Sequence, residues 1–303
     1  MEIIKINGLT KTYGNLTAVN NISFSVNKGE LLGFLGVNGA GKSTTINMLS
    51  TLIRPDNGSA DLCGFRLGGQ NSEIRRRIGI VSQSNCLDNL MTVRENLLCR
   101  GILHGADKQQ AKKRLEELSG IFALDELLKK SYRTLSGGQK RRCEIAAALM
   151  HTPEILFLDE PTTGLDPATR NEVWETIDAL RKNTEMTVFL TTHYMEEAAQ
   201  AGRIIIINKG NIIAEGTPNE LKTRYAADTL RIYCDRNNIP QLIKLHPTAK
   251  ENDNGIQITI ASTMEALPVL EKIKVSISGF EVIQGTMDDV FLAAVGDETK
   301  GDE

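Results

Sequence analysis

The stretch GVNGAGKST at residues 36–44 joins an apolar run to a segment with helical periodicity. Before it, residues 31–35 (LLGFL) are apolar without alternation, which is typical of a strand buried on both faces. After it, Ile46, Leu49 and Ile53 follow at spacings of three and four residues, which predicts one face of a helix. The sequence therefore predicts a glycine-rich loop between a buried strand and a helix.

This loop matches a phosphate-binding pattern. Gly36, Gly41, Lys42 and Ser43 fit G-x-x-x-x-G-K-[ST] in the strand–loop–helix context that the pattern requires. Glycine allows backbone N–H groups to approach phosphate oxygens, and the helix N-terminus adds about half a positive charge. Lys42 is expected to pair with the β and γ phosphates and Ser43 to offer its hydroxyl to Mg²⁺. The same loop contributes three further candidates for nucleotide binding: Asn38, Gly39 and Thr44.

Two adjacent carboxylates end another apolar run, ILFLDEP at residues 155–161. Asp159 is predicted to bind Mg²⁺ through water, and Glu160 to orient or deprotonate the attacking water. An acidic pair that merely ends a strand is the alternative when Asp-Glu is considered alone. Together with the phosphate loop, the pair favours metal-assisted hydrolysis.

Composition limits the class of protein. The chain has 303 residues, 41% hydrophobic and 24% charged, as in an ordinary globular protein, and no apolar run approaches the roughly 18 to 20 residues of a membrane span. Its start does not resemble a secretory signal, which favours the cytosol. The five cysteines form no C-x-x-C pair, so reduced thiols are expected. A net charge of -3 argues against nucleic acid as the main ligand, although residues 140–142 could form a local basic patch.

The rest of the pattern predicts an α/β domain with an insertion and an appendage. Residues 22–26 alternate as in an antiparallel strand with one wet face, and apolar runs at 155–158, 187–190 and 204–207 alternate with helical segments. Residues 88–150 lack convincing strands and are predicted to form an inserted helical subdomain. From 221 onward two alternating strands are expected, with helices near 264–274 and 287–295, the second capped by Thr286. We expect domains at 1–220 and 221–303.

A second glycine motif, LSGGQKRR at residues 135–142, also begins a predicted helix. Two helix N-termini suited to anions in one chain suggest a nucleotide held between two surfaces. The pattern leaves open whether these surfaces belong to one chain or to two.

With this motif the chain resembles the ATP-binding subunits of ATP-binding cassette (ABC) transporters. LSGGQ at 135–139 is similar to the signature of that family, in the family's order between the phosphate loop and the ILFLDEP strand. Single residues match other family elements: Tyr13 the aromatic that stacks on adenine, Gln83 the glutamine that senses Mg²⁺ and the γ-phosphate, Asp166 the loop that crosses the dimer, and His193 the histidine at the γ-phosphate. The resemblance covers roughly residues 1–220. One departure is TGLD at residues 163–166, where many members have Ser-Ala before Leu-Asp. This departure leaves Asp166 in place.

The resemblance implies an α/β P-loop NTPase fold: a parallel-sheet core of RecA type, an N-terminal antiparallel β subdomain, the inserted helical subdomain and a small C-terminal α/β appendage. It also implies that two cassettes bind two ATP molecules head to tail. The γ-phosphate held by Lys42 of one chain is then capped by three residues of the other: Ser136, Gly137 and Gly138. The second cassette is a second copy or a related subunit, with a homodimer favoured.

The resemblance further implies membrane subunits on separate chains, with this chain on the cytoplasmic side of the cell membrane. Residues 285–296 (GTMDDVFLAAVG) resemble the ending of ATPases from daunorubicin-type drug exporters, whose membrane partners are of the ABC-2 class, and residues 88–97 resemble the same branch. By this resemblance, residues of about 84–100 are expected to form part of the groove that receives a short cytoplasmic helix of the membrane partner. The apolar residues there are either that contact or helical core: Cys86, Leu87, Leu90 and Met91.

Drug or antimicrobial export is therefore favoured over two alternatives. An importer ATPase would share the catalytic residues but would more often end in an all-β barrel. A soluble ABC ATPase acting on nucleic acid or ribosomes would need a long coiled-coil insertion or two cassettes in one chain.

Overall fold

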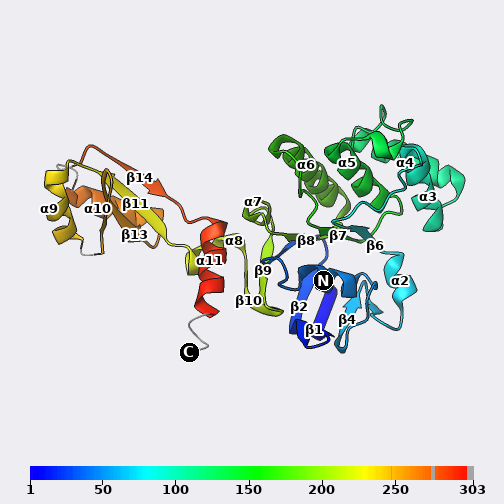
Figure 1. Cartoon of the computed structure of the whole chain (residues 1–303), viewed down its shortest axis with the longest axis horizontal. Coiled ribbons are helices and arrows are strands. Elements are labelled where there is room, and N and C mark those ends of the chain that lie inside the picture. The colour runs from blue at the N-terminus through cyan, green and yellow to red at the C-terminus, as the bar shows by residue number, and fades with distance from the viewer. Residues whose placement is uncertain (247, 274–276, 299–303) are drawn as a thin grey trace. The chain divides into compact units, whose positions relative to one another are not determined.

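The computed structural model describes residues 1–246, 248–273 and 277–298 (Figure 1). Contacts divide the chain into two compact units, 1–212 and 213 onward. The expected domain boundary at 220/221 stays a prediction; it falls inside a helix, α8 (Pro218–Tyr225). None of the helices in the described residues has the length and apolar character needed to cross a lipid bilayer.

The first unit is built on a six-stranded sheet in the order β10-β9-β3-β8-β7-β6. Strands β6, β7, β8, β3 and β9 are parallel along that order. Their apolar runs are buried almost throughout, because both faces of the sheet are covered. The α/β fold class predicted from the sequence is thereby confirmed. The strands are β3 (Leu31–Leu35), β6 (Ile78–Val81), β7 (Ile155–Asp159), β8 (Thr187–Thr192), β9 (Arg203–Asn208) and β10 (Asn211–Gly216).

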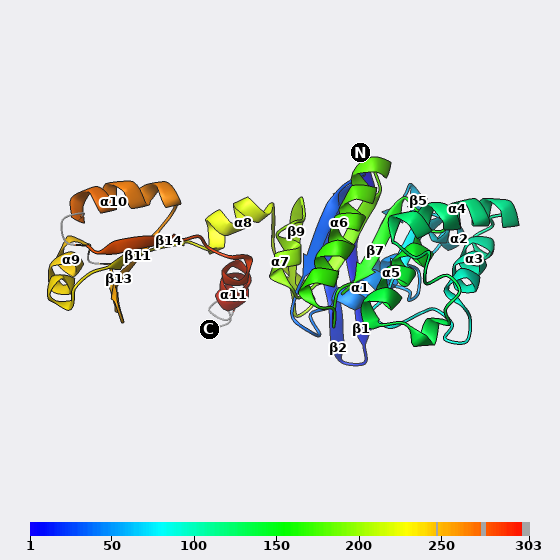
Figure 2. The same ribbon diagram turned by 90° about the horizontal axis from the view of Figure 1, so that it is seen from above.

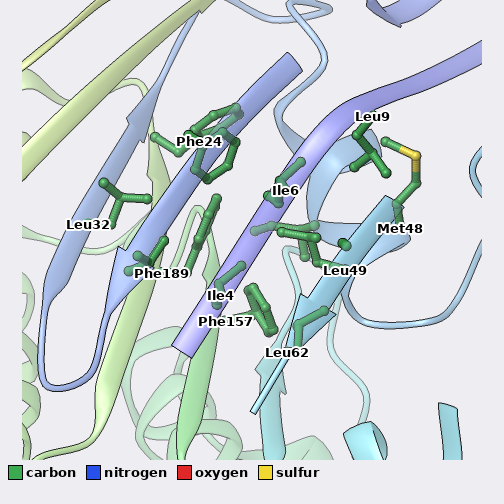
Figure 3. Close-up of a cluster of buried hydrophobic side chains, with 14 of the residues drawn as sticks. Ile4, Ile6, Leu9, Phe24, Leu32, Met48, Leu49, Leu62, Phe157 and Phe189 are labelled. Carbon is green, nitrogen blue, oxygen red and sulfur yellow. The ribbon is translucent and has the colours of Figure 1, made fainter. Parts of the chain in front are cut away.

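A second, antiparallel sheet in the order β2-β1-β4-β5 packs its apolar side chains against the first. It confirms the predicted N-terminal antiparallel sheet. Ring centroids of Phe24 and Phe34 lie 5.7 Å apart, and those of Phe34 and Phe189 lie 5.4 Å apart. Figure 3 shows Ile4 and Ile6 of the same core, with Phe24 and Phe189 on one side of them and Leu49 on the other. The strands are β1 (Glu2–Tyr13), β2 (Leu16–Asn27), β4 (Asn57–Leu62) and β5 (Phe65–Arg66).

Helix α1 (Lys42–Leu49) follows the glycine loop, as predicted, but it is shorter than expected. Ile46 and Leu49 are buried on its inner face, whereas Ile53 lies beyond its end. Thr51 has a positive φ of 66°, a left-handed conformation that a helix cannot continue through. Ile53 still packs against the core from the following loop, which explains why its spacing imitated a helix face.

The segment 88–150 is helical, and its strand-like pairing is limited to a single bridge between Thr92 and Ser131 within these residues, all of which the structure describes. It connects β6 to β7, which are neighbouring parallel strands, so it is an enlarged crossover. In two views α3, α4 and α5 group beside the β6–β7 end of the sheet (Figure 1, Figure 2). The helices are α3 (Val93–Leu103), α4 (Lys108–Ile121), a short 3-10 turn (Tyr132–Thr134) and α5 (Gly137–Ala148).

The first unit also contains one long helix and two short ones outside this segment. Helix α6 (Pro167–Thr184) buries Val173, Trp174 and Ile177, the periodic positions identified in the sequence. Helices α2 (Asn71–Arg75) and α7 (Met195–Ala198) are short.

The second unit contains a four-stranded antiparallel sheet in the order β12-β13-β11-β14. With one helix after β11 and one after β13, this is the split β-α-β topology of ferredoxin-like domains. The predicted strands are present, except that Cys234 lies just past the end of β11. The elements are β11 (Asp228–Tyr233), α9 (Ile239–Leu245), β12 (Lys250–Asn252), β13 (Gly255–Ile260), α10 (Ala266–Ile273) and β14 (Gly279–Ile283).

Helices α8 and α11 (Met287–Glu298) contact each other within this unit. Thr286 caps α11 as predicted, because its hydroxyl accepts a hydrogen bond of 3.2 Å from the Asp289 N–H. The other predicted helix, 264–274, corresponds to α10 and a preceding 3-10 turn (Thr263–Glu265); residue 274 lies outside the described residues.

Candidate functional site

The glycine loop leaves no room for side chains at two positions. A Cβ at Gly36 would lie 2.4 Å from the Ile207 carbonyl oxygen, and a Cβ at Gly41 would lie 2.4 Å from that of Ala18. Gly41 also has a φ of 111°, which L-residues with a Cβ rarely adopt. These positions therefore require glycine, and α1 starts at the following lysine with its N-terminus on the loop.

Lys42 lies inside this loop rather than on the surface. Its Nζ donates hydrogen bonds of 2.7 Å to the Gly36 carbonyl and 3.2 Å to the Val37 carbonyl. The same atom lies 3.6 Å from Glu160 Oε1. Burial lowers the pKa of Lys42, and the Glu160 carboxylate opposes that shift. An anion that binds at the loop, in addition to the Glu160 carboxylate, would therefore meet the desolvated ammonium of Lys42.

Ser43 and Asp159 lie together at the base of the site. The Ser43 hydroxyl donates a hydrogen bond of 3.2 Å to Asp159 Oδ1, and the Thr191 hydroxyl donates one of 2.5 Å to the same oxygen. Ser43 comes from α1, Asp159 from the end of β7 and Thr191 from β8. Adjacent parallel strands thus fix the carboxylate beside the serine.

Glu160 has neighbours from three other segments. Its Oε2 accepts hydrogen bonds of 3.4 Å from Gln83 Nε2 and 3.3 Å from the Thr163 hydroxyl. His193 Nδ1 lies 3.3 Å from this oxygen, but the ring is not oriented for a hydrogen bond to it. The backbone of Glu160 has a positive φ of 47°, a left-handed conformation that residues with a Cβ seldom adopt. Three residues predicted as catalytic are thus adjacent: Gln83, Glu160 and His193.

A hollow of about 470 Å³ opens above these groups. Tyr13 is 49% exposed at its rim, and Lys11 Nζ lies over its ring, 5.5 Å from the centroid. Nine of the predicted residues line this hollow: Tyr13, Asn38, Gly39, Gly41, Lys42, Ser43, Thr44, Gln83 and Glu160.

The four remaining nucleotide-binding candidates line no part of this hollow and form a second cluster. Ser136 caps α5 in a reciprocal capping box with Gln139. Asp166 caps α6, accepting a hydrogen bond of 3.0 Å from the Thr169 N–H. A Cβ on Gly138 would lie 2.6 Å from Thr169 Cγ2, so the starts of α5 and α6 are in close contact. Gly137, by contrast, faces open space.

The sequence did not reveal two buried charged residues near the site. Glu197 accepts hydrogen bonds from the Thr162 hydroxyl and, at 2.6 Å, from the Thr192 hydroxyl, so it joins the segments that follow Glu160 and precede His193. Arg141, which the sequence suggested as part of a basic patch, is only 7% exposed and binds backbone carbonyls. Acidic and basic residues on helices look like surface residues in a sequence, and no periodic signal distinguishes these two.

A second hollow, of about 380 Å³, lies between the helical segment and the parallel sheet. Leu52 and Cys86 are among the residues that line it. Of the apolar residues whose role the sequence left open, Leu87 is buried core at 7% exposed, whereas Leu90 is 83% exposed and Met91 is 37% exposed.

The sequence matches two family models. A model described as ABC transporter matches residues 19–163, and one described as the C-terminal domain of DrrA1-3-like ATP-binding proteins matches residues 216–295. The daunorubicin/doxorubicin resistance ATP-binding protein DrrA of Streptomyces peucetius is 39% identical, over 97% of this chain and 92% of that protein. The chain belongs to the ABC transporter family of ATP-binding proteins.

Other ABC proteins are also similar to this chain. The doxorubicin resistance ATP-binding protein DrrA of Mycobacterium tuberculosis is 38% identical over 98% of this chain and 95% of its own length. The Nod factor export ATP-binding protein I of Ralstonia nicotianae is 35% identical over 98% of this chain and 95% of its own length. Among solved ABC structures, a dimeric post-hydrolysis cassette, MJ0796, bound to ADP and Pi, has a TM-score of 0.66 and 29% identity, covering 71% of this chain and 98% of that one. The chain is therefore an ABC ATPase that binds nucleotide and hydrolyses ATP.

Proposed function

We propose that this ATPase powers the export of a drug or antimicrobial compound through separate membrane subunits of the ABC-2 class. The observation that carries the proposal is the match of residues 216–295 to the DrrA-like C-terminal domain, together with full-length similarity to drug-resistance ATP-binding proteins. The alternative of an importer would favour an all-β tail, whereas the tail here is a mixed α/β unit. On this proposal the chain works at the cytoplasmic face of the cell membrane.

The residues around the first hollow suit MgATP. Tyr13 would stack on the base, and the loop amides with Lys42 would hold the phosphates. The oxygens of Ser43 and Asp159, 3.2 Å apart, are hard donors of the kind that Mg²⁺ takes together with phosphate oxygens. The side-chain oxygen of Gln83 would complete this set. Bound there, Mg²⁺ would neutralise charge that develops on the phosphates.

Glu160 is assigned the role of general base. Its Oε1 faces Lys42 and its Oε2 faces Gln83 and His193, so a γ-phosphate held by the lysine would place its attacking water within reach of the carboxylate. His193 is 36% exposed and adjacent, which suits a contact with the γ-phosphate. The proton taken from water would move to Glu160.

The second cluster is assigned to the ATP of a partner cassette. Ser136, Gly137 and Gly138 begin α5, a helix of twelve residues, and the exposed N–H groups there suit an anion. These residues lie outside the lining of the hollow around Lys42 of the same chain, which supports a head-to-tail dimer with Asp166 at the crossing point. We propose a homodimer.

A pull-down from detergent-solubilised native membranes tests the transport proposal. Tagged Glu160→Gln protein with MgATP is expected to retain a polytopic membrane protein in stoichiometric amount. Recovery of soluble proteins or ribosomes alone would contradict the transport role and leave the ATPase assignment standing.

A further inference from the structure

Arg141 reaches out of helix α5 to the backbone of the catalytic segments. Its side chain is 8% exposed, although it lies only five positions after the Ser136 cap of the helix. The guanidinium donates to backbone carbonyls, which are those of Ser82 (2.7 Å), Asp159 (3.4 Å), Glu160 (3.2 Å) and Pro161. The Arg141 side chain thus contacts both the turn that carries Glu160 and Ser82, the residue before Gln83.

A buried carboxylate fixes the other side of the guanidinium. Arg141 Nη1 lies 3.0 Å from Glu144 Oε2, one helical turn later. The second oxygen of Glu144 accepts hydrogen bonds of 3.0 Å from the Tyr132 hydroxyl and 3.1 Å from the Cys86 N–H. Buried charges are retained at acceptable cost only when paired and hydrogen-bonded, and this pair meets both conditions.

The turn that Arg141 holds is conformationally demanding. Glu160 has a Cβ but adopts a left-handed backbone, with φ of 47°. Such a residue persists only when its surroundings determine its conformation. The Glu160 N–H donates to the Thr191 carbonyl at 3.0 Å. The Glu160 carbonyl accepts hydrogen bonds of 3.2 Å from Arg141 Nη2 and 3.4 Å from the Thr163 N–H.

We propose that Arg141 is a positioning residue for ATP hydrolysis, which aims the Glu160 carboxylate and keeps the Gln83 segment in register with it. The inference rests on the proposed role of Glu160 as general base. Arg141 does not line the hollow around Lys42; it acts through the backbone of the turn. Since it holds the turn rather than the phosphate loop, its loss affects the chemical step and leaves nucleotide binding intact.

Arg141→Lys tests this role. Lysine keeps the charge, but a single ammonium cannot span carbonyls in several directions as the planar guanidinium does. We expect kcat for ATP to fall about 10- to 100-fold, since misplacement of a catalytic group by about 1 Å has an effect of that order. The KM for ATP should remain close to that of the wild type, whereas the thermal midpoint should fall, because some of the buried carbonyls that Arg141 binds lose their donor. Arg142→Lys is the matched control, because Arg142 donates to the Phe122 carbonyl, at 3.5 Å, away from the turn, and its kcat should change less than about twofold.

A second variant keeps the test decisive if Arg141→Lys does not fold. Arg141→Met with Glu144→Gln removes both charges, while the glutamine oxygen still accepts from Tyr132 and the Cys86 amide. It should show the same kcat loss at unchanged KM. An unchanged kcat in either folded variant, or a loss that merely follows the unfolded fraction, overturns the inference. If Glu160→Gln itself hydrolyses ATP normally, the base assignment fails and the inference fails with it; a dead Glu160→Gln with active Arg141 variants overturns the inference alone.

Discussion

Lys42 Nζ lies 3.6 Å from Glu160 Oε1, and these side chains are only 5% and 10% exposed. The cation predicted to hold phosphate therefore faces the carboxylate predicted to activate water. A γ-phosphate placed between them would meet a positive group on one side and a base on the other. With the proposed roles, both ATP binding and water activation would depend on this buried pair.

Because Lys42 belongs to this buried pair, we expect it to take up a proton when ATP binds at alkaline pH. Burial holds the pKa of Lys42 below its ordinary value of 10.5, and phosphates beside the ammonium would raise the pKa again. As the pH rises through this lowered pKa, Lys42 of the nucleotide-free protein loses its proton. ATP binding must then restore that proton. Calorimetry in two buffers of different ionisation enthalpy, in a Glu160→Gln background to prevent turnover, should show uptake that grows with pH.

Lys42→Arg provides the control, because a guanidinium stays charged throughout this range. The variant should bind ATP without the pH-dependent uptake. Equal uptake in both proteins would assign the proton to another group.

Tyr13 is predicted to contribute to ATP affinity and not to turnover. Stacking of a base on an aromatic ring is worth about 1–3 kcal/mol, which corresponds to a roughly 5- to 150-fold change in affinity. Tyr13→Ala should therefore raise the KM for ATP by that factor with little change in kcat. Tyr13→Phe keeps the ring and should behave like the wild type in the same steady-state assay; a similar KM in Tyr13→Ala would rule out stacking.

His151 is predicted to make stability depend on pH. Its ring stacks on His104 with centroids 3.8 Å apart, and its Nε2 lies 2.9 Å from the Ile78 carbonyl. Burial, with a smaller effect from His104, lowers the pKa of His151 to about 4 from 6.5. The folded state therefore favours the neutral ring, and this stabilisation is complete above pH 6.5 and is lost as pH falls towards 4.

From proton linkage, this shift lowers the free energy of unfolding by about 2 kcal/mol between pH 7 and pH 5. His151→Phe keeps an aromatic ring and removes the titration, so its free energy of unfolding should fall less over this interval. Denaturant titrations at the two pH values measure the difference. An equal fall in both proteins would mean that other groups carry the effect.

The second hollow is predicted to bind the membrane subunit. Leu52 lines it and is 66% exposed, so Leu52→Asp should reduce co-purification of the membrane subunit at least tenfold without changing basal ATPase activity. Leu103→Asp alters a leucine that is 73% exposed outside the hollow and should have no effect. Equal loss in both variants would point to general surface disruption.

The sequence predicted much of the fold because buried parallel strands and glycine turns leave strong local patterns. It also predicted which residues would surround the first hollow, since Gly41 and Lys42 occupy fixed places in a motif. It missed Thr191, whose hydroxyl orients Asp159, because a threonine at the end of a strand is common. Arg141 was missed for a different reason: apart from Glu144, its partners are backbone carbonyls, which no sequence pattern encodes. Ile53 was misassigned because helical spacing alone does not reveal where a left-handed residue ends the helix.

The measurement that tests the account most directly is made on Glu160→Gln with MgATP. Removing a general base typically costs about 10²- to 10⁴-fold in rate, and the amide still permits nucleotide binding. ATP turnover should fall by at least a hundredfold, and light scattering coupled to size exclusion should show a dimer that forms only with ATP. A monomer with wild-type turnover would contradict the role assigned to Glu160.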